Sequence, residues 1–154
     1  TQTSNLIFTT IKLNDTFGPN DKRPKLFNLW KKCMKTSQTL DMSPGSQTID
    51  ASYIEDVVSA YEIMVKNLSG RNSIKYNNKS FVVTNQEKPN LIELSKIFES
   101  VTGKALPIAW GAREYREREV MSPYSLGLTV PNWKQKFTLK EAIKKTIGDA
   151  QDDS

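Results

Sequence analysis

The chain has 154 residues, a formal net charge of +5, no histidine and a single cysteine. A chain of this length can bury a core as one domain, and it holds no apolar stretch near the roughly 20 residues that span a membrane. Without histidine it lacks every Ser-His-Asp and Cys-His nucleophile arrangement, and Cys33 has no second cysteine for a disulfide or a zinc site. We therefore expect a cytoplasmic protein without membrane or metal sites.

The first predicted element is a buried parallel strand at residues 6–13, and a turn follows it at residues 14–21. The strand is rich in apolar and β-branched residues, and Gly18-Pro19 breaks the chain soon after it. In open α/β sheets, ligands bind beyond the carboxyl ends of parallel strands, so we predict a functional role for this turn. A plain turn signal at Gly18-Pro19 is the alternative.

A helix is predicted after Pro24, because Pro suits a first helical turn and apolar residues follow at helical spacing. Its apolar face comprises Leu26, Phe27, Leu29, Trp30, Cys33 and Met34. Residues 39–42 and 48–54 then have the pattern of short strands around a turn at residues 43–46. We expect these strands to form a small satellite sheet.

A second helix is predicted from about Glu55, since apolar residues recur at steps of three and four on one stripe that we expect in the core. The stripe comprises Ile54, Val57, Val58, Tyr61, Met64, Val65 and Leu68. The polar residues 69–78 predict a surface loop, and a strand is expected at residues 81–84.

Two capping boxes predict the starts of the last two helices. Asn90 with Glu93 opens a helix that stops at Gly103, and a strand at residues 106–110 follows it. Thr138 with Glu141 opens a helix that ends near residue 148, ahead of an acidic tail. The alternation of strands and helices predicts an α/β fold across residues 1–154.

Two groups of basic residues stand out in a chain whose other lysines and arginines are spread along its length. They are Lys22, Arg23 and Lys25 after the first turn, and Arg113, Arg116 and Arg118 near the end. Two such groups can converge on one phosphate-bearing ligand, and a basic solvated surface is the alternative. No recognised nucleic-acid motif is present, so we do not expect nucleic-acid binding.

Four motifs occur in an order that is informative. Residues 11–19 (Ile-Lys-Leu-Asn-Asp-Thr-Phe-Gly-Pro) are similar to Leu-Arg-x-x-Asn-x-Tyr-Gly-Pro, and residues 47–56 to Gln-x-Arg-Asp-x-x-x-Val-x-Asp-Val. Residues 90–103 are similar to a Ser-x-x-Glu-Leu helix that ends in Thr-Gly-Lys, and residues 132–142 to Gly-Trp-x-Pro-x-x-x-Leu-x-Glu-Gly. In this order the chain resembles the C-terminal, substrate-binding half of an extended short-chain dehydrogenase/reductase of the NAD-dependent sugar-nucleotide epimerase/dehydratase family. Residues 23–26, 42–45 and 115–119 resemble its CDP-abequose/paratose synthase-like branch.

This resemblance implies the C-terminal part of a Rossmann-like fold with a small substrate-binding subdomain, without the N-terminal dinucleotide-binding half. The parent protein would hold NAD or NADP and a nucleotide-sugar, whereas this chain alone would hold no cofactor. The family's glycine-rich loop and its Tyr-x-x-x-Lys pair would precede Thr1, so we expect no catalytic residues here and an inactive isolated chain. The chain begins at Thr1 without methionine, which favours a piece of a longer polypeptide.

The resemblance also implies site residues, position by position. Asp15 stands where the family has an Asn that contacts the diphosphate, and a carboxylate there favours a sugar hydroxyl or a basic partner. Lys25 falls where the family's helix reaches the phosphates. Arg116 resembles a phosphate-binding Arg of the family, with Arg113 as the fallback, while the Arg of the Gln-x-Arg-Asp segment is replaced by Ile49.

Four further positions complete the predicted site. Leu40 and Met42 fall on the short strand that lines the nucleotide base in the family. Leu13 and Asn14 match positions beside the nicotinamide of the cofactor.

We therefore predict the substrate-binding portion of an NAD(P)-dependent nucleotide-sugar reductase, epimerase or dehydratase of polysaccharide biosynthesis. The alternative is a free-standing, non-catalytic module that binds a phosphorylated ligand or a protein partner. Because a strand taken from a parallel sheet leaves unpaired backbone groups, we expect the isolated chain to self-associate or to stay bound to its missing half.

Overall fold

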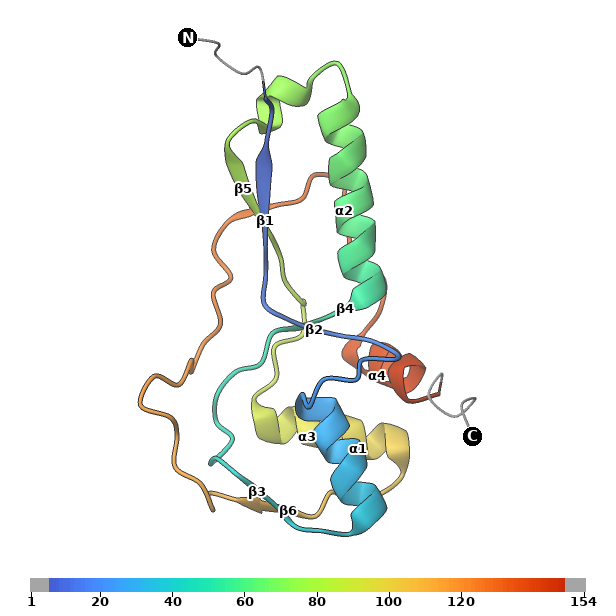
Figure 1. The fold of residues 1–154 in the computed structure, drawn as a ribbon, viewed down its shortest axis with the longest axis vertical. Helices are drawn as coiled ribbons and strands as arrows, with labels where there is room; N and C mark the ends of the chain where they lie inside the picture. Colours follow the sequence, from blue (N-terminus) through green and yellow to red (C-terminus); the bar gives the residue numbers. More distant parts are fainter. Residues whose placement is uncertain (1–5, 149–154) are drawn as a thin grey trace.

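The computed structural model describes residues 6–148, which form an elongated molecule of two lobes joined at a waist (Figure 1). The upper lobe, as drawn in Figure 1, contains β1 (Thr9–Leu13), α2 (Ile54–Ser69), the 3-10 helix η1 (Ser73–Tyr76), β5 (Lys79–Val83) and β7 (Leu128–Thr129). The lower lobe contains α1 (Leu26–Thr36), β3 (Leu40–Met42), α3 (Leu91–Thr102), β6 (Ile108–Trp110) and α4 (Leu139–Gly148). Strands β2 (Asp15–Phe17) and β4 (Ala51–Tyr53) lie at the waist.

All strands of the described residues pair in parallel. The upper lobe has the order β1-β5-β7, with Thr9 opposite Lys79 and Leu13 opposite Val83. Strand β2 pairs with β4 at the waist, and β3 pairs with β6 in the lower lobe. The predicted α/β class is thereby confirmed, and the parallel sheets explain why each chain reversal runs through a helix or a long loop.

The two predicted capping boxes are present. In α3, the Asn90 side chain accepts a hydrogen bond from the Glu93 amide at 2.8 Å, and Glu93 accepts one from the Asn90 amide at 2.9 Å. Gly103 ends this helix with φ of 67°, a left-handed conformation that suits glycine. Thr138 and Glu141 make the same reciprocal contacts before α4. The acidic tail predicted after this helix lies outside the described residues.

An aromatic cluster forms the core of the lower lobe. The rings of Phe27 and Phe98 stack with centroids 5.8 Å apart, and Trp30 meets Phe98 edge-on at 5.2 Å. Trp30 is completely buried. Cys33 lies one turn further along α1, where its thiol donates to the Trp30 carbonyl and burial raises the pKa of the thiol. This lobe therefore closes its core with residues of three helices.

A second apolar cluster forms the core of the upper lobe. Val57, Ala60 and Met64 of α2 pack with Phe81 and Val83 of β5. The indole of Trp133 donates to the Asp56 carbonyl and to the Ser59 hydroxyl, both at 3.0 Å, so the segment before α4 is fastened to α2. The upper lobe thus has one helix on one face of its sheet.

Asp50 joins the two lobes near the waist. Its side chain is completely buried and accepts hydrogen bonds from the Asn85 amide at 2.8 Å and from the Asn14 side chain at 3.0 Å. Lys88 forms an ion pair with it at 3.5 Å. A buried carboxylate needs such partners, so this contact holds the ends of β1, β4 and β5 together.

The structure corrects several strand predictions. Residues 15–17, predicted as part of a turn, form β2, because pairing with β4 satisfies their backbone groups. The strands at residues 39–42 and 48–54 do not pair with each other; they pair with β6 and β2 instead. The predicted strand at residues 6–13 is five residues long, and none of its residues is fully buried. Neither η1 nor β7 was predicted.

The stripe predicted as core on α2 is divided. Val57 and Met64 are buried, but Ile54, Val58, Tyr61 and Val65 expose 39–59% of their surface. Apolar residues spaced three and four apart can lie on two adjacent faces of a helix. Only one of these two faces of α2 packs on the sheet. No helix within residues 6–148 is long and apolar enough to cross a membrane.

Candidate functional site

A cavity of about 360 Å³ lies at the waist of the molecule. It is bounded by β2, by the loop and first turn of α1, by Ala51 of β4, by Thr146 of α4 and by Arg116. We call it the waist cavity. Four segments that are far apart in the sequence therefore contribute to one site.

One wall of the waist cavity is apolar. It is made by Phe17, Leu26, Phe27, Ile49 and Ala51. The rings of Phe17 and Phe27 pack against each other with centroids 4.7 Å apart, and both residues belong to the core of the lower lobe. Because these side chains are held by the core, the wall is a rigid surface for a flat or apolar part of a ligand.

Charged groups stand around this wall. Lys25 pairs with Asp15 at 3.2 Å, and both side chains are exposed. Asp21 accepts two hydrogen bonds from the Arg23 guanidinium, at 2.8 and 2.7 Å, and these lower the pKa of its carboxyl from 3.8 to about 2. Of the basic groups that line the cavity, Arg116 has no ion pair within 4.0 Å among the described residues.

The amino end of α1 opens onto the waist cavity. Lys25 is its N-cap and supplies no side-chain cap, and the first turn contains no acidic residue. Leu26, Phe27 and Asn28 of that turn line the cavity. Uncapped backbone amides and the helix dipole favour an anion at such a helix start. The Asn28 side chain donates to the carbonyls of Asp21 and Arg23, which fixes the loop that leads into the helix.

Arg116 reaches the cavity from the long segment after β6. Its neighbour Tyr115 hydrogen-bonds through its hydroxyl to both the amide and the side chain of Ser46. The Glu119 amide donates to the Arg116 carbonyl at 3.0 Å and closes a turn. Gly45, next to Ser46, has φ of 82°, and a Cβ there would lie 2.8 Å from side-chain atoms of Ile92 and Trp110. The turn therefore needs glycine, and it anchors the arginine segment.

The structure brings three of the predicted site residues together. Asp15, Lys25 and Arg116 line the waist cavity, and Asp15 has a basic partner in Lys25. Their contact with a ligand stays a prediction.

The other predicted residues lie outside the lining of the waist cavity. Leu40 and Met42 lie on β3 against the lower core, and the Met42 sulfur accepts from the Trp30 indole at 3.5 Å. Arg113 donates its amide to the Met42 carbonyl. Leu13 and Asn14 lie at the end of β1. There the side-chain amide of Asn14 donates to the Asp50 carboxylate and to the Tyr124 carbonyl.

Four polar lining residues were not named as site residues. Thr16 and Asp21 lie in the turn at residues 14–21 that was predicted to be functional, whereas Asn28 and Thr146 lie outside it. Asp21 lies two residues before Arg23, and this spacing of opposite charges was a signal that could have been used. Asn28 and Thr146 sit on amphipathic helices without a distinguishing pattern, and only tertiary packing brings them to the site. Among residues 6–148, no group of three or more His, Cys, Asp or Glu side chains could hold a metal ion.

Comparisons with known proteins add to this geometry. No family model matches the chain. CDP-abequose synthase from Salmonella muenchen is 30% identical over 145 residues, covering 91% of this chain and 47% of that protein. CDP-abequose synthase from Yersinia pseudotuberculosis is 27% identical over 119 residues, covering 77% of this chain and 40% of that protein. The chain thus spans about half the length of the curated relatives that it matches.

Solved structures share the fold at low sequence identity. UDP-glucuronic acid 4-epimerase from Bacillus cereus, solved with NAD and a fluorinated UDP-glucuronic acid, matches with a TM-score of 0.76 at 14% identity, over 94% of this chain and 45% of that one. UDP-glucose 4-epimerase from Thermotoga maritima, solved with UDP-glucose, has a TM-score of 0.73 at 19% identity, over 94% and 46%. RMD from Pseudomonas aeruginosa, solved with NADPH, has a TM-score of 0.65 at 17% identity, over 92% and 47%.

The fold and the sequence matches define a class of protein. The chain is a distant homologue of part of CDP-abequose synthase. It shares its fold with part of the solved UDP-sugar 4-epimerases.

Proposed function

We propose that this chain is the C-terminal, substrate-binding portion of an NAD(P)-dependent nucleotide-sugar reductase, epimerase or dehydratase. One observation carries the proposal: in a homologue of CDP-abequose synthase, Lys25, Arg116 and the open start of α1 converge on a cavity with an apolar wall. Such a cavity can accept the phosphates of a nucleotide-sugar at its basic side and an apolar sugar face at its wall.

The ion pair between Asp15 and Lys25 gives binding a defined order of contacts. A diphosphate that approaches Lys25 competes with the Asp15 carboxylate, because both are anions that bind the same ammonium group. In the bound state Asp15 is then free to accept a hydrogen bond from a sugar hydroxyl. Arg116 adds a planar guanidinium that can hold a phosphate with two hydrogen bonds.

In this proposal the remaining predicted residues act at the margins of the ligand. Leu40 and Met42 lie toward the base, and Arg113 is the fallback contact to a phosphate. Leu13 and Asn14 lie toward the nicotinamide of NAD or NADP in the parent protein. The chain's own residues do not form a complete dinucleotide site. The Asn14 side-chain amide already donates to two groups, and the seven glycines are not spaced as a glycine-rich phosphate loop. We propose that the isolated chain is inactive and that the parent is cytoplasmic.

The second candidate is a free-standing module that binds a phosphorylated ligand without chemistry. The observation in its favour is that the lower lobe closes its own core, and that side chains packed in this core form the apolar wall of the waist cavity. Such a module would bind the phosphate group regardless of the attached sugar, whereas the first candidate requires the whole nucleotide-sugar for tight binding.

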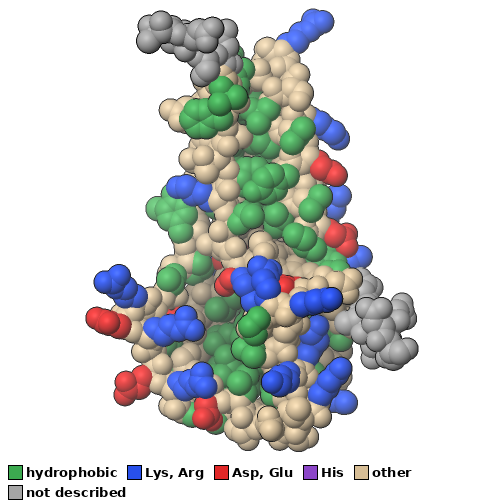
Figure 2. Space-filling view, in the orientation of Figure 1, with side chains coloured by type: hydrophobic (Ala, Val, Ile, Leu, Met, Phe, Trp, Pro, Cys, Tyr) green, Lys and Arg blue, Asp and Glu red, His purple; other side chains and the backbone are tan. Residues whose placement is uncertain are grey.

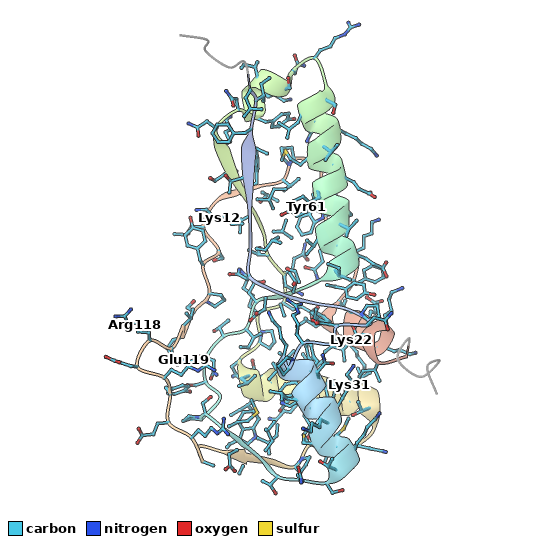
Figure 3. All side chains as sticks on the ribbon, in the orientation of Figure 1. Lys12, Lys22, Lys31, Tyr61, Arg118 and Glu119 are labelled. Carbon is cyan, nitrogen blue, oxygen red and sulfur yellow. The ribbon has the colours of Figure 1, made fainter. Side chains whose placement is uncertain are left out.

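Isothermal titration of the full chain with CDP-glucose, UDP-glucose, CDP and inorganic pyrophosphate tests the proposal. We expect the nucleotide-sugars to bind best and Arg116→Gln to weaken binding about tenfold, since a hydrogen bond to a charged group contributes about 1.5–3 kcal/mol. Arg118→Gln is the matched control, because Arg118 belongs to the same segment but points away from the cavity (Figure 3).

Each outcome of this titration decides between the two candidates. Binding of pyrophosphate as tight as that of the nucleotide-sugars favours the free-standing module. No binding of any of the four ligands at millimolar concentration contradicts both.

A further inference from the structure

A second hollow lies on the lower lobe, apart from the waist cavity. It has a volume of about 460 Å³ and is bounded by residues from the carboxyl-terminal halves of α1, α3 and α4 and from the turn after α3. Its floor is apolar, because Met34, Val101 and Ile147 line it and also pack against the lower core. Lys31, labelled in Figure 3, lies on the right of the lower lobe, where Figure 2 shows basic side chains gathered. Four lysines surround the floor, and we call the hollow the lysine groove; they are Lys31, Lys35, Lys104 and Lys144.

The four lysines are not paired with carboxylates among residues 6–148. None of them forms an ion pair within 4.0 Å in this part of the chain, and no Asp or Glu lines the groove. Burial lowers the pKa of the Lys31 ammonium, and the charge of Lys35 lowers it further, with a smaller opposing effect of Asp21. Cations that stand together around an apolar floor destabilise one another, so a bound anion is favourable there.

Helix dipoles account for only one of these lysines. A lysine in the last turn of a helix interacts favourably with the dipole, and Lys35 holds that place in α1. Lys31 and Lys144 lie at least one turn before the ends of their helices, and Lys104 comes after α3. The dipole effect falls off within the last turn. A basic cluster that is drawn from three elements and stands around an apolar floor therefore indicates an anionic ligand.

The sequence that follows the groove is acidic. Gly148 lines the groove, and the next six residues include Asp149, Asp152 and Asp153 and no Lys or Arg. These residues, 149–154, lie outside the described part of the chain. Six extended residues span up to about 20 Å, which exceeds the width of a hollow of this volume. Because the segment is attached beside the groove, its carboxylates have an effective concentration of about millimolar there.

We propose that the acidic segment 149–154 of this chain is the ligand of the lysine groove. The charges are complementary, since three aspartates of the segment face four lysines of the groove. Each exposed ion pair contributes little alone, but several pairs act together on a segment that is already attached. A free phosphate ion meets only the charges, whereas a peptide also covers the apolar floor. The inference goes beyond the proposed function and uses no lining residue of the waist cavity, so docking and nucleotide binding can fail independently.

Zero-length cross-linking of the full chain with a carbodiimide tests the proposal, because this reagent joins a carboxylate to an amine only where the two are in contact. Mass spectrometry of the digested protein identifies the joined residues. We expect segment 149–154 to join Lys31 and Lys104 at least about fivefold more often than Lys32 and Lys96. The latter two are matched controls, since they lie exposed on α1 and α3 and do not line the groove. The yield at Lys31 and Lys104 should fall as NaCl is raised from about 20 to about 500 mM, because salt screens the attraction.

A variant of the segment supplies a second readout. Asp152→Asn/Asp153→Asn keeps the chain length but removes two charges, and we expect acetic anhydride to modify Lys31 and Lys104 at least about threefold faster in this variant. Equal rates in both proteins would overturn the proposal, as would cross-links spread evenly over groove and control lysines.

The same experiments separate the other possible occupants. In a mixture of ¹⁵N-labelled and unlabelled chains, cross-links that join only different chains would overturn the proposal and assign the groove to a second copy. Protection of Lys31 and Lys104 by inorganic pyrophosphate, with no effect of Asp152→Asn/Asp153→Asn, would overturn it in favour of a phosphate-bearing ligand.

Discussion

The lower and upper lobes are built from the same kinds of residues but differ in how much apolar surface they cover. In the lower lobe α1, α3 and α4 enclose Trp30, Leu94 and Phe98, all of which are fully buried. In the upper lobe helix α2 covers one face of a three-stranded sheet, and the side chains of Ile54, Val58, Tyr61 and Val65 on this helix remain exposed. A folded lobe can thus close its core with its own residues, whereas a parallel sheet needs neighbours on its edges and both faces.

This difference predicts unequal local stability. Amide exchange depends on local opening, and regions with few buried apolar contacts open most easily. We therefore expect the backbone amides of the lower lobe to remain protected from exchange longest. Substitutions in the lower lobe, at the junction of the lobes and at a surface contact test this comparison.

The largest effect is expected from Trp30→Ala in the lower lobe. Removing a fully buried indole from the cluster with Phe27 and Phe98 should lower the free energy of unfolding by about 3–5 kcal/mol. Urea denaturation followed by circular dichroism measures this change. Leu29→Ala on the same helix is the matched control, because Leu29 is 37% exposed and should cost less than about 1.5 kcal/mol. Equal losses of stability in the two variants would show that the buried face of α1 does not contribute more to the core than its exposed face.

An intermediate effect is expected from Asp50→Ala at the junction of the lobes. The change leaves the Asn85 amide and the Lys88 ammonium without their buried acceptor, at a cost of about 2–3 kcal/mol. Asp50→Asn keeps an acceptor of similar shape and should cost less. If the junction couples the lobes, tryptophan fluorescence and circular dichroism should give separate unfolding midpoints in Asp50→Ala and a common one in the natural chain. Coincident midpoints in the variant would contradict this coupling.

A smaller effect is expected from Asn90→Ala, which removes one half of the α3 capping box. The Glu93 amide then loses its acceptor, and the melting temperature should fall by an amount equivalent to about 1 kcal/mol. Asn90→Ser retains a capping oxygen and should preserve most of the stability. A melting temperature that is equal for both variants would show that the cap does not stabilise this lobe.

The smallest effect concerns pH and the pair of Asp21 and Arg23. Because the guanidinium lowers the pKa of Asp21 from 3.8 to about 2, the pair contributes stability above pH 3.8 and loses it as the pH falls through 2. The contribution should stay below about 1 kcal/mol, since the pair lies near the surface. Carboxyl titration by NMR should show Asp21 protonating near pH 2, and at a higher pH in Arg23→Gln, which loses the guanidinium but keeps the hydrogen bond from the backbone amide of residue 23. A midpoint near 3.8 in the natural chain would contradict the pairing.

The comparison of lobes also explains which features the sequence could predict. Helix starts were predictable because their signals are local, as with Asn90 and Glu93. The strand partners were not, because β3 pairs with β6 across 68 residues (Leu40 opposite Ile108) and no local pattern records that choice. The burial of Trp30 in the lower lobe agrees with the predicted apolar face of its helix. On α2, by contrast, which apolar residues are buried depends on the elements that pack beside the helix.

For the candidate site, too, local sequence signals predicted some residues, whereas residues from distant segments could not be predicted. The motif around Asp15 and the basic groups with Lys25 and Arg116 indicated three residues that line one cavity. The resemblance to a family also suggested Leu40 and Met42, which lie in a different sheet outside that lining. Thr146 arrives at the cavity on the last helix, and only the packing of α4 brings it there.

The burial of Cys33 has a practical consequence for such experiments. It is the chain's single cysteine, it lies in the lower lobe, and burial raises the pKa of its thiol, so alkylating reagents have little thiolate to attack in the folded state. Its rate of modification therefore reports how often α1 detaches, with about tenfold slowing for each 1.4 kcal/mol of opening free energy. Since the upper lobe contains no thiol, one reagent can time the opening of the lower lobe alone.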